Sequence, residues 1–222
     1  MIHFYLSIPA SMSIGELVRI KFTLVKAQLG TVFSEYPKNW RFALADSLLG
    51  LASLFFNPYR ACRKRGFVYG ETPISSLRRI ASFCQLKPED VWLELGSGRG
   101  KGAFWISQTI GCETAGVEAV PLFVNVARAI VRILRLPKIS FTCGKMADAD
   151  FSKATCVYLY STCMEEEELA SLSEKMKALP PGARVLTVSA PLPETAHLPC
   201  AGSFPLSFPW GETEGFLHVY RK

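Results

Sequence analysis

A glycine-rich turn between a predicted strand and a predicted helix limits the possible folds of this chain more than any other feature. Residues 91–95 form a short, mainly apolar run, and Gly96-Ser-Gly-Arg-Gly100 follows it directly. Glycine has no Cβ, so it adopts conformations that other residues avoid and lets the backbone approach a ligand closely. In an open α/β sheet, a turn of this kind at the carboxyl end of a strand is where ligands bind.

Short apolar runs and helical patterns alternate on both sides of this turn. Thr72-Pro73 is typical of a helix N-terminus, and Pro121 opens another helix. We predict strands at residues 91–95, 114–118, 139–142, 155–160 and 183–189, and a helix over residues 165–179. This alternation predicts an α/β fold, namely a Rossmann-like, doubly wound and mostly parallel sheet with helices on both faces.

The carboxyl-terminal part departs from this alternation. Residues 190–214 contain prolines, glycines and short apolar runs but no helical periodicity. Two parallel strands need a long crossover connection, which is usually a helix. Because no such helix is predicted here, we expect the last strand, residues 215–220, to run antiparallel to its neighbour.

The first 66 residues are predicted to form a helical extension, and residues 67–222 the main domain. Ser13-Ile-Gly-Glu16 is a capping box that begins one helix, and Gly30 is placed to end it. A second helix is predicted at residues 40–56, because Asn57-Pro58 stops it. We expect this apolar helix to be largely buried against the main domain; a role in dimerisation or at a membrane surface is the alternative.

Composition excludes a disordered chain and favours a globular protein. Of the 222 residues, 49% are hydrophobic and 20% are charged, and the formal net charge is +6. No apolar run reaches the ~20 residues needed to cross a bilayer, and we recognise no export signal. The seven cysteines and three histidines show no metal-ligand spacing. We therefore expect free thiols, no metal and a cytoplasmic location.

Two glutamates near the glycine turn indicate the chemistry of the ligand. Glu94 lies two residues before the first glycine, and Glu118 ends the next predicted strand. A carboxylate beside the turn repels a pyrophosphate but attracts a cation, and S-adenosylmethionine carries an ammonium and a sulfonium. A second carboxylate can accept both ribose hydroxyls. These charges favour a methyl-donor site. One alternative is a dinucleotide site, because Gly98, Gly100 and Ala103 nominally match the G-x-G-x-x-G/A fingerprint. The other alternative is a tight turn with an incidental glutamate and no ligand.

These motifs resemble those of a known enzyme class. Glu94-Leu-Gly-Ser-Gly-Arg-Gly100, with Gly116-Val-Glu118 downstream, is similar to motifs I and II of the class I, seven-β-strand methyltransferases that use S-adenosylmethionine. Tyr69-Gly-Glu-Thr-Pro73 resembles the run that lines the cofactor pocket in Dot-one-like histone lysine methyltransferases. The ending from Trp210-Gly to His218-Val-Tyr220 resembles that of the mitochondrial ATP-synthase c-subunit lysine methyltransferases. Over residues 67–222, the resemblance implies a seven-strand sheet with an antiparallel last strand, S-adenosylmethionine as cofactor and a protein lysine as acceptor.

The resemblance also implies roles for individual residues. Glu94, Gly96 and Gly98 are expected to hold the methionine part of the donor, and Glu118 the ribose. Met146 is expected to face the adenine, and Tyr69 with Thr72 to form a lid. The full set of cofactor-binding candidates is Tyr69, Glu71, Thr72, Glu94, Gly96, Ser97, Gly98, Gly100, Glu118, Ala119, Lys145 and Met146.

The acceptor side departs from the Dot-one-like pattern. That pattern has an acid where this chain has Lys145, and an Asn-Asn-Phe run where it has Tyr160-Ser-Thr162. Enzymes that methylate the planar nitrogens of glutamine, adenine or cytosine have an Asn/Asp-Pro-Pro-aromatic loop after the fourth strand. This chain has no such loop at that position. An amine acceptor must arrive deprotonated, and a partly apolar, aromatic wall favours its neutral form. Tyr160 and Tyr69 are the candidates for this wall, and Tyr160 and Ser161 are the candidate catalytic residues.

A protein that presents a lysine is the expected partner. A basic cluster precedes the lid and consists of Arg60, Arg63, Lys64 and Arg65. This cluster could bind an acidic protein surface or a nucleic acid; the alternative is that it is an ordinary solvent-exposed face. The alternative functions are an RNA or small-molecule methyltransferase, and a binding module that keeps the fold without catalysis.

Overall fold

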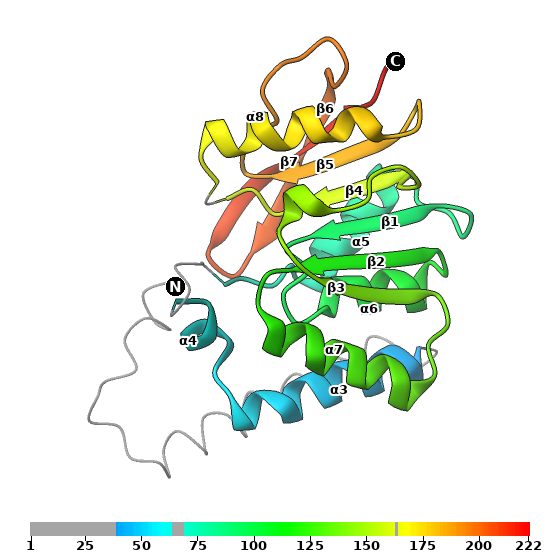
Figure 1. The fold of residues 1–222 in the computed structure, drawn as a ribbon, viewed down its shortest axis with the longest axis vertical. Helices are drawn as coiled ribbons and strands as arrows, with labels where there is room; N and C mark the ends of the chain where they lie inside the picture. The colour runs from blue at the N-terminus through cyan, green and yellow to red at the C-terminus, as the bar shows by residue number, and fades with distance from the viewer. Residues whose placement is uncertain (1–38, 64–68, 163) are drawn as a thin grey trace.

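The computed structural model describes residues 39–63, 69–162 and 164–222, and within them seven strands form one sheet with helices on both faces (Figure 1). The strands are β1 (Val91–Leu95), β2 (Glu113–Glu118), β3 (Ile139–Cys143), β4 (Cys156–Leu159), β5 (Arg184–Val188), β6 (Cys200–Phe208) and β7 (Gly211–Val219). The α-helices are α3 (Trp40–Phe55), α4 (Pro58–Arg63), α5 (Ile74–Phe83), α6 (Lys101–Thr109), α7 (Pro121–Leu134) and α8 (Glu166–Lys175), and two 3-10 turns are η1 (Met146–Asp148) and η2 (Met176–Ala178). The helix predicted over residues 13–30 lies outside the described residues.

The sheet has the strand order β3-β2-β1-β4-β5-β7-β6. The five strands β1 to β5 are parallel to their neighbours within this group. β7 pairs antiparallel with both β5 and β6. The predicted fold, a doubly wound and mostly parallel sheet with an antiparallel last strand, is therefore confirmed.

The sequence pattern did not predict β6, which lies in the region expected only to lack a helix. This strand pairs with β7 at the edge of the sheet, and its register shifts between Cys200 and Gly202. It also contains Pro205, which has no amide to donate and is tolerated at an edge. Both features obscure the strand signal. The last strand is also longer than expected, because it begins at Gly211 rather than at residue 215.

Alternating side chains divide the hydrophobic core between the two faces of the sheet. In β4, Cys156 and Tyr158 pack in the layer with α3, α5, α6 and α7, whereas Val157 and Leu159 pack on the side of α8. Trp92 of β1 stacks on Tyr158, with 5.5 Å between the ring centroids. Successive side chains of a strand point to opposite faces, so strands covered on both faces are apolar throughout.

Helix α3 packs on α6 and α7 and so joins the extension to the main domain (Figure 1). Asn39 accepts from the Phe42 amide at the start of the helix and donates to Thr109 Oγ1 at 2.8 Å. The predicted helix is confirmed to within one residue, and so is its packing on the main domain. The expectation of a largely buried helix holds for one face only: Phe42 and Leu49 are fully buried, whereas Phe55 is 90% exposed. The boundary between extension and main domain stays a prediction.

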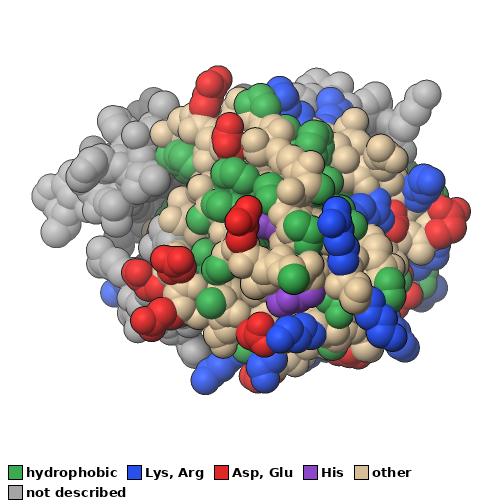
Figure 2. Space-filling model, turned by 90° about the horizontal axis from the view of Figure 1, so that it is seen from above, with side chains coloured by type: hydrophobic (Ala, Val, Ile, Leu, Met, Phe, Trp, Pro, Cys, Tyr) green, Lys and Arg blue, Asp and Glu red, His purple; other side chains and the backbone are tan. Residues whose placement is uncertain are grey.

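The face above α8 carries charges of both signs. Figure 2, seen from above Figure 1, shows a group of acidic side chains on the left, further acidic side chains at the centre and right, and most of the basic side chains on the right. Helix α8 begins with Glu166, Glu167 and Glu168 and has Lys175 in its last turn. This order of charges complements the helix dipole. Among the helices described, none is long and apolar enough to span a membrane.

Candidate active site

The glycine turn lies at the carboxyl end of β1, where the winding of the sheet changes direction. β2 pairs with one side of β1 and β4 with the other. Connections leave such a point in opposite directions and open a crevice above the strand ends. Gly96, Gly98 and Gly100 have φ angles of +73°, +55° and +88°. These angles lie in the left-handed region that favours glycine.

Glu94 is the first of two carboxyl groups beside this turn. The residue is 6% exposed, and a Cβ atom on Gly102 in α6 would lie only 2.6 Å from Glu94 Oε1. Burial raises the pKa of Glu94 to about 8; the Trp92 indole beside the carboxyl group opposes this effect, and repulsion from Glu118 and Glu71 adds to it. Its Oε2 has no hydrogen-bond partner among the described residues. A buried polar atom without a partner is costly, and a cation placed beside Glu94 would favour its charged form.

Glu118, the second carboxyl group, ends β2 and is held by two backbone amides. The Gly98 amide donates to Glu118 Oε2 at 2.8 Å, and the Val120 amide donates to Oε1 at 2.8 Å. Each oxygen of a carboxylate can accept more than one hydrogen bond. Glu118 is therefore oriented by the protein and retains the capacity to accept two hydroxyl groups.

Two predicted donor-site side chains stand over the glycine turn. A Cβ on Gly96 would lie 3.1 Å from the terminal methyl of Met146, which belongs to η1 after β3. A Cβ on Gly98 would lie 3.2 Å from Cε2 of Tyr69, in the predicted lid. Met146 and Tyr69 thus wall the space above the turn, as expected for groups that enclose a flat ligand. A side chain at either glycine would crowd Met146 or Tyr69.

The remaining predicted residues near the turn differ in their surroundings. Ser97 is buried, and a Cβ on Gly116 in β2 would lie 2.8 Å from its Oγ. Gly100 is the N-cap of α6, whereas Ala119 is half-buried after β2 and Lys145 is exposed before η1. Their contacts with a donor stay predictions.

The predicted lid is fixed at both of its ends. Thr72 Oγ1 lies 2.6 Å from the hydroxyl of Tyr158, which is buried in β4. At the other end, the Tyr69 hydroxyl accepts from Arg99 Nε of the glycine turn at 2.8 Å and donates to Glu71 Oε1 at 2.5 Å. Burial of Tyr158 raises the pKa of its hydroxyl, so this group remains neutral and available as a donor. These contacts hold the lid against the carboxyl end of the sheet.

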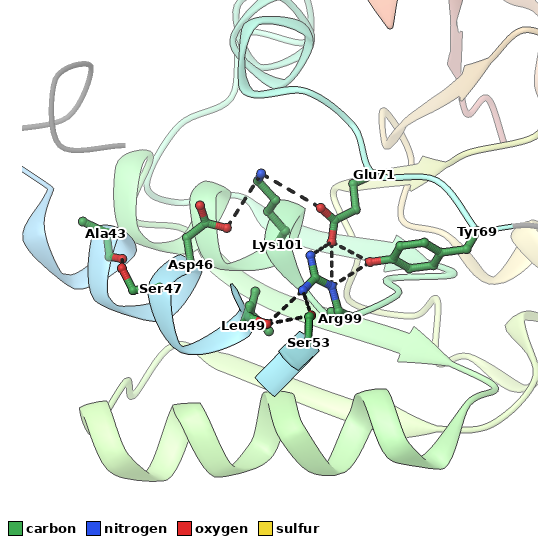
Figure 3. A network of polar contacts seen from close by, with 9 residues as sticks. All are labelled: Ala43, Asp46, Ser47, Leu49, Ser53, Tyr69, Glu71, Arg99 and Lys101. Atoms are coloured by element: carbon green, nitrogen blue, oxygen red, sulfur yellow. Dashed lines mark hydrogen bonds and ion pairs between the residues drawn. The ribbon is translucent and has the colours of Figure 1, made fainter. Parts of the chain in front are cut away.

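Glu71 is engaged by charged protein groups, which Figure 3 shows together. Its Oε1 accepts from Arg99 Nη2 at 2.5 Å, and its Oε2 lies 4.0 Å from Lys101 Nζ. Burial alone would raise the pKa of Glu71, but Arg99 and Lys101 outweigh this effect and lower it. The ionised Glu71 therefore serves as a counter-ion inside the lid, and its predicted contact with the donor stays a prediction.

Sequence reasoning missed Arg99. A charged residue in a glycine turn usually projects into solvent, but Arg99 is only 7% exposed and donates to Tyr69 and Glu71. Its position between Gly98 and Gly100 was the available signal, because two left-handed glycines fix the direction of the residue between them. The pairing itself joins residues far apart in the sequence and could not be inferred from local patterns.

Aromatic side chains gather near the lid, beyond the carboxyl end of β4. The Tyr160 hydroxyl accepts a hydrogen bond from Trp210 Nε1 at 2.8 Å, and the Tyr160 ring lies 5.4 Å from that of Phe208. A Cβ on Gly70 would lie 3.6 Å from the Tyr160 ring, so this ring lies against the lid. The structure thus places Tyr160 beside the lid, as the wall hypothesis requires, and adds Trp210, which the sequence did not assign to the site.

Ser161 has a different environment from Tyr160. The residue is 1% exposed, and its Oγ lies 2.7 Å from the carbonyl oxygen of Val188 and 2.9 Å from that of Ala190. A serine hydroxyl has a single proton to donate. This proton is shared between two backbone carbonyls, so the geometry favours a structural role that ties the end of β4 to the end of β5. Catalysis by Ser161 stays a prediction without a supporting contact.

The other predicted features lie away from these contacts. Arg60 is exposed on α4 and Arg63 ends this helix, but Lys64 and Arg65 are outside the described ranges. The part of the chain that the structure describes holds no group of three or more His, Cys, Asp or Glu residues suited to a metal. Two hollows of about 370 and 350 Å³ lie at the opposite, amino edge of the sheet. Neither is lined by Glu94 or Glu118, and we place the site at the carboxyl edge because the glycine turn and both carboxyl groups lie there.

Fold and site together define the class of protein. The seven-strand sheet, the glycine turn after β1 and the carboxyl groups at the ends of β1 and β2 are those of a class I, S-adenosylmethionine-dependent methyltransferase domain. S-adenosylmethionine is the cofactor of this class, and Glu94 and Glu118 fit its cationic and ribose parts. Residues 55–188, more than half of the chain, match the model of the family described as "Histone methylation protein DOT1". The chain belongs to this family.

Individual relatives are distant. The chain is 25% identical over 141 residues to a histone-lysine N-methyltransferase, H3 lysine-79 specific, of Dictyostelium discoideum; the match covers 57% of this chain but 8% of that protein. Among solved structures, an RNA methyltransferase of Salinibacter ruber, in complex with S-adenosyl-L-homocysteine, has a TM-score of 0.59 and 24% identity over 69% of this chain and 95% of that chain. TrmN of Thermus thermophilus has a TM-score of 0.55 and 15% identity over 65% and 48%. These structural likenesses show the fold alone.

Proposed function

We propose that this protein transfers the methyl group of S-adenosylmethionine to an amine, and specifically to the side chain of a protein lysine. The observation that carries the donor assignment is the pair of buried carboxyl groups at the glycine turn, Glu94 without a partner on Oε2 and Glu118 held by two amides. Membership of the DOT1 family and the distant H3 lysine-79 methyltransferase support lysine as the acceptor.

The protein itself forms no covalent bond in this reaction. When bound, the donor supplies a methyl group on a sulfonium; the amine lone pair forms the new N–C bond while the C–S bond breaks and its electrons return to sulfur. The protein must align the two partners and keep water out. Glu94 and Glu118 orient the donor, while Tyr69 and Met146 enclose the space above the turn.

The acceptor amine must be neutral when it reacts. A lysine that enters a desolvated space loses its proton more readily, because burial disfavours the charged form. Tyr160, Phe208 and Trp210 provide aromatic surface beside the lid. We assign this surface to the acceptor side chain, with Tyr160 as its wall. The proposal places the enzyme in the cytoplasm, which the free thiols of the six cysteines in the described residues support.

A labelling experiment tests the proposal. The full chain is incubated with S-adenosylmethionine labelled on its methyl group and with a cell lysate, which is then divided and treated with protease or with nuclease. We expect protease to remove the label from the macromolecular fraction and acid hydrolysis to release methyl-lysine. Excess unlabelled S-adenosylhomocysteine should suppress labelling.

Other outcomes would contradict the proposal in identifiable ways. Label that nuclease removes would indicate an RNA methyltransferase, and label in the small-molecule fraction a metabolite methyltransferase. Donor binding without product in any fraction would indicate a binding module. Failure of the protein to bind S-adenosylhomocysteine at all would contradict the donor assignment itself.

A further inference from the structure

The side chain of Arg99 connects three parts of the chain that are distant in sequence. From the glycine turn it reaches α3 on one side and the lid on the other (Figure 3). Its Nη1 donates to the carbonyl oxygen of Leu49 at 2.9 Å and to Ser53 Oγ, both in the last two turns of α3. Its Nε donates to the Tyr69 hydroxyl at 2.8 Å and to Glu71 Oε1 at 2.9 Å.

Charge makes this arrangement specific for a guanidinium group. Burial would lower the pKa of Arg99, but Glu71 beside it outweighs this effect and raises the pKa, so the side chain stays charged. A planar guanidinium can direct several donors in fixed directions at once, which an ammonium group cannot. Without Arg99, the half-buried carboxylate of Glu71 would have Lys101, at 4.0 Å, as its nearest cationic partner in the described chain.

Lys101 forms a second, weaker link between the same elements. Its Nζ lies 3.7 Å from Asp46 Oδ1 in α3 and 4.0 Å from Glu71 Oε2 in the lid. Asp46 is 1% exposed, so α3 presents a buried acid as well as a carbonyl group toward the turn. Two cationic side chains, one on each side of Gly100, therefore hold the lid to α3.

We infer that Arg99 is a positioning residue of the donor site, and that α3 is a structural part of this site through it. The inference rests on the proposed function. Arg99 does not need to touch the donor: it holds the hydroxyl of Tyr69, whose ring lies over Gly98, and the carboxylate of Glu71. Loss of the guanidinium frees the lid and removes the Tyr69 wall from its place above the turn.

The test compares the affinity for S-adenosylhomocysteine, measured by calorimetry on the full chain, among matched variants. Arg99→Met removes the guanidinium but keeps most of the stem, and we expect its Kd to rise about tenfold or more. Arg99→Lys should recover only part of the affinity. Arg184→Met is the control, because Arg184 is also a part-buried arginine in an ion pair, with Asp90, far from the lid.

Two serines of α3 provide a second comparison, with substitutions that remove only a hydroxyl group. Ser47 and Ser53 each donate to the carbonyl oxygen four residues earlier, at 2.7 and 2.8 Å, but only Ser53 is a partner of Arg99. Ser53→Ala should raise the Kd roughly twofold to fivefold and have no further effect in the Arg99→Met background. Ser47→Ala should leave the Kd unchanged.

The outcomes separate this inference from the proposed function. If the wild-type chain binds S-adenosylhomocysteine, and folded Arg99→Met and Ser53→Ala bind it equally well, Arg99 is only structural and the inference is wrong. If Arg99→Met does not fold, the serine pair decides in the same way. If the wild-type chain does not bind, the proposed function is wrong and this inference falls with it.

Discussion

The amide of Gly98 donates a hydrogen bond to the carboxylate of Glu118 at 2.8 Å, across 20 residues of sequence. This bond joins the turn after β1 to the end of β2, and the Val120 amide holds the other oxygen of the same carboxylate. The two motifs recognised in the sequence are therefore one physical unit. Hydrogen bonds from two backbone amides fix the direction of this carboxylate.

Replacing Glu118 with Gln should strongly weaken donor binding. The amide group of Gln has one acceptor oxygen, so its NH₂ would face either the Gly98 or the Val120 amide, and a donor would meet a donor. With each charge-assisted hydrogen bond contributing about 1.5–3 kcal/mol, we expect roughly a 10- to 100-fold rise in the Kd for S-adenosylhomocysteine by calorimetry. Glu113→Gln, at the exposed start of the same strand, is the control. Equal affinities for the two variants would exclude Glu118 from the site.

Gly102→Ala should separate donor binding from stability. The new Cβ would lie 2.6 Å from Glu94 Oε1 and displace this carboxyl group. Alanine favours a helix by about 1 kcal/mol over glycine, which offsets the displacement, so the free energy of unfolding should change by no more than about 1 kcal/mol. The Kd for S-adenosylhomocysteine should rise about tenfold. Gly144→Ala, where a Cβ meets nothing within 4 Å, should change neither; unaltered binding by Gly102→Ala would contradict the role of Glu94.

The raised pKa of Glu94 predicts an unusual dependence of stability on pH. This pKa rises from an ordinary value of 4.5 to about 8 on folding. Between these values the unfolded chain releases the Glu94 proton while the folded protein keeps it, so the folded state loses stability as the pH rises. Chemical denaturation of unliganded protein at pH 5 and pH 8 should show this loss, and Glu94→Gln should reduce it. A pH dependence identical in the two proteins would contradict the prediction.

His218 predicts an effect of the opposite sign. The Leu192 amide donates to Nε2 at 3.2 Å, so Nε2 is unprotonated and Nδ1 donates to the Leu198 carbonyl oxygen at 3.1 Å. Burial lowers the pKa of His218 below 6.5. The unfolded chain therefore takes up the proton first, and this contribution to stability is lost as the pH falls below about 6.5. Relative to His218→Gln, the wild type should lose stability between pH 7.5 and 5.5; His197→Gln serves as the control.

Trp210→Phe should affect the acceptor side alone. The substitution keeps an aromatic ring but removes the Nε1 donor that holds the Tyr160 hydroxyl. We expect a several-fold lower initial rate of methyl incorporation into protein and an unchanged Kd for S-adenosylhomocysteine. Trp40→Phe, on the exposed start of α3, should alter neither quantity. A loss of donor affinity in Trp210→Phe would place this residue in the donor site instead.

Much of the arrangement around the glycine turn could be predicted because its signals are local. Glu94 and the glycines occupy one strand-to-helix connection, and Glu118 ends the next strand, so spacing alone brings them to the same edge of a parallel sheet. The helix at residues 40–56 was also predictable, since apolar periodicity and Asn57-Pro58 define it. The strand β6 was not, because a proline and a register shift weaken the pattern of an edge strand.

The sequence by itself determined the alternation of strands and helices, the glycine turn and the two carboxyl groups, because hydrogen bonding and periodicity act over short stretches of chain. Only the tertiary structure decided that Arg99 is buried between α3 and the lid, that Ser161 is bound to backbone carbonyls, and that Trp210 holds Tyr160. These contacts join residues 27 to 50 positions apart. No local preference encodes such a pairing. The partners meet only when the elements that carry them pack together, and each buried polar group then needs a hydrogen-bond partner.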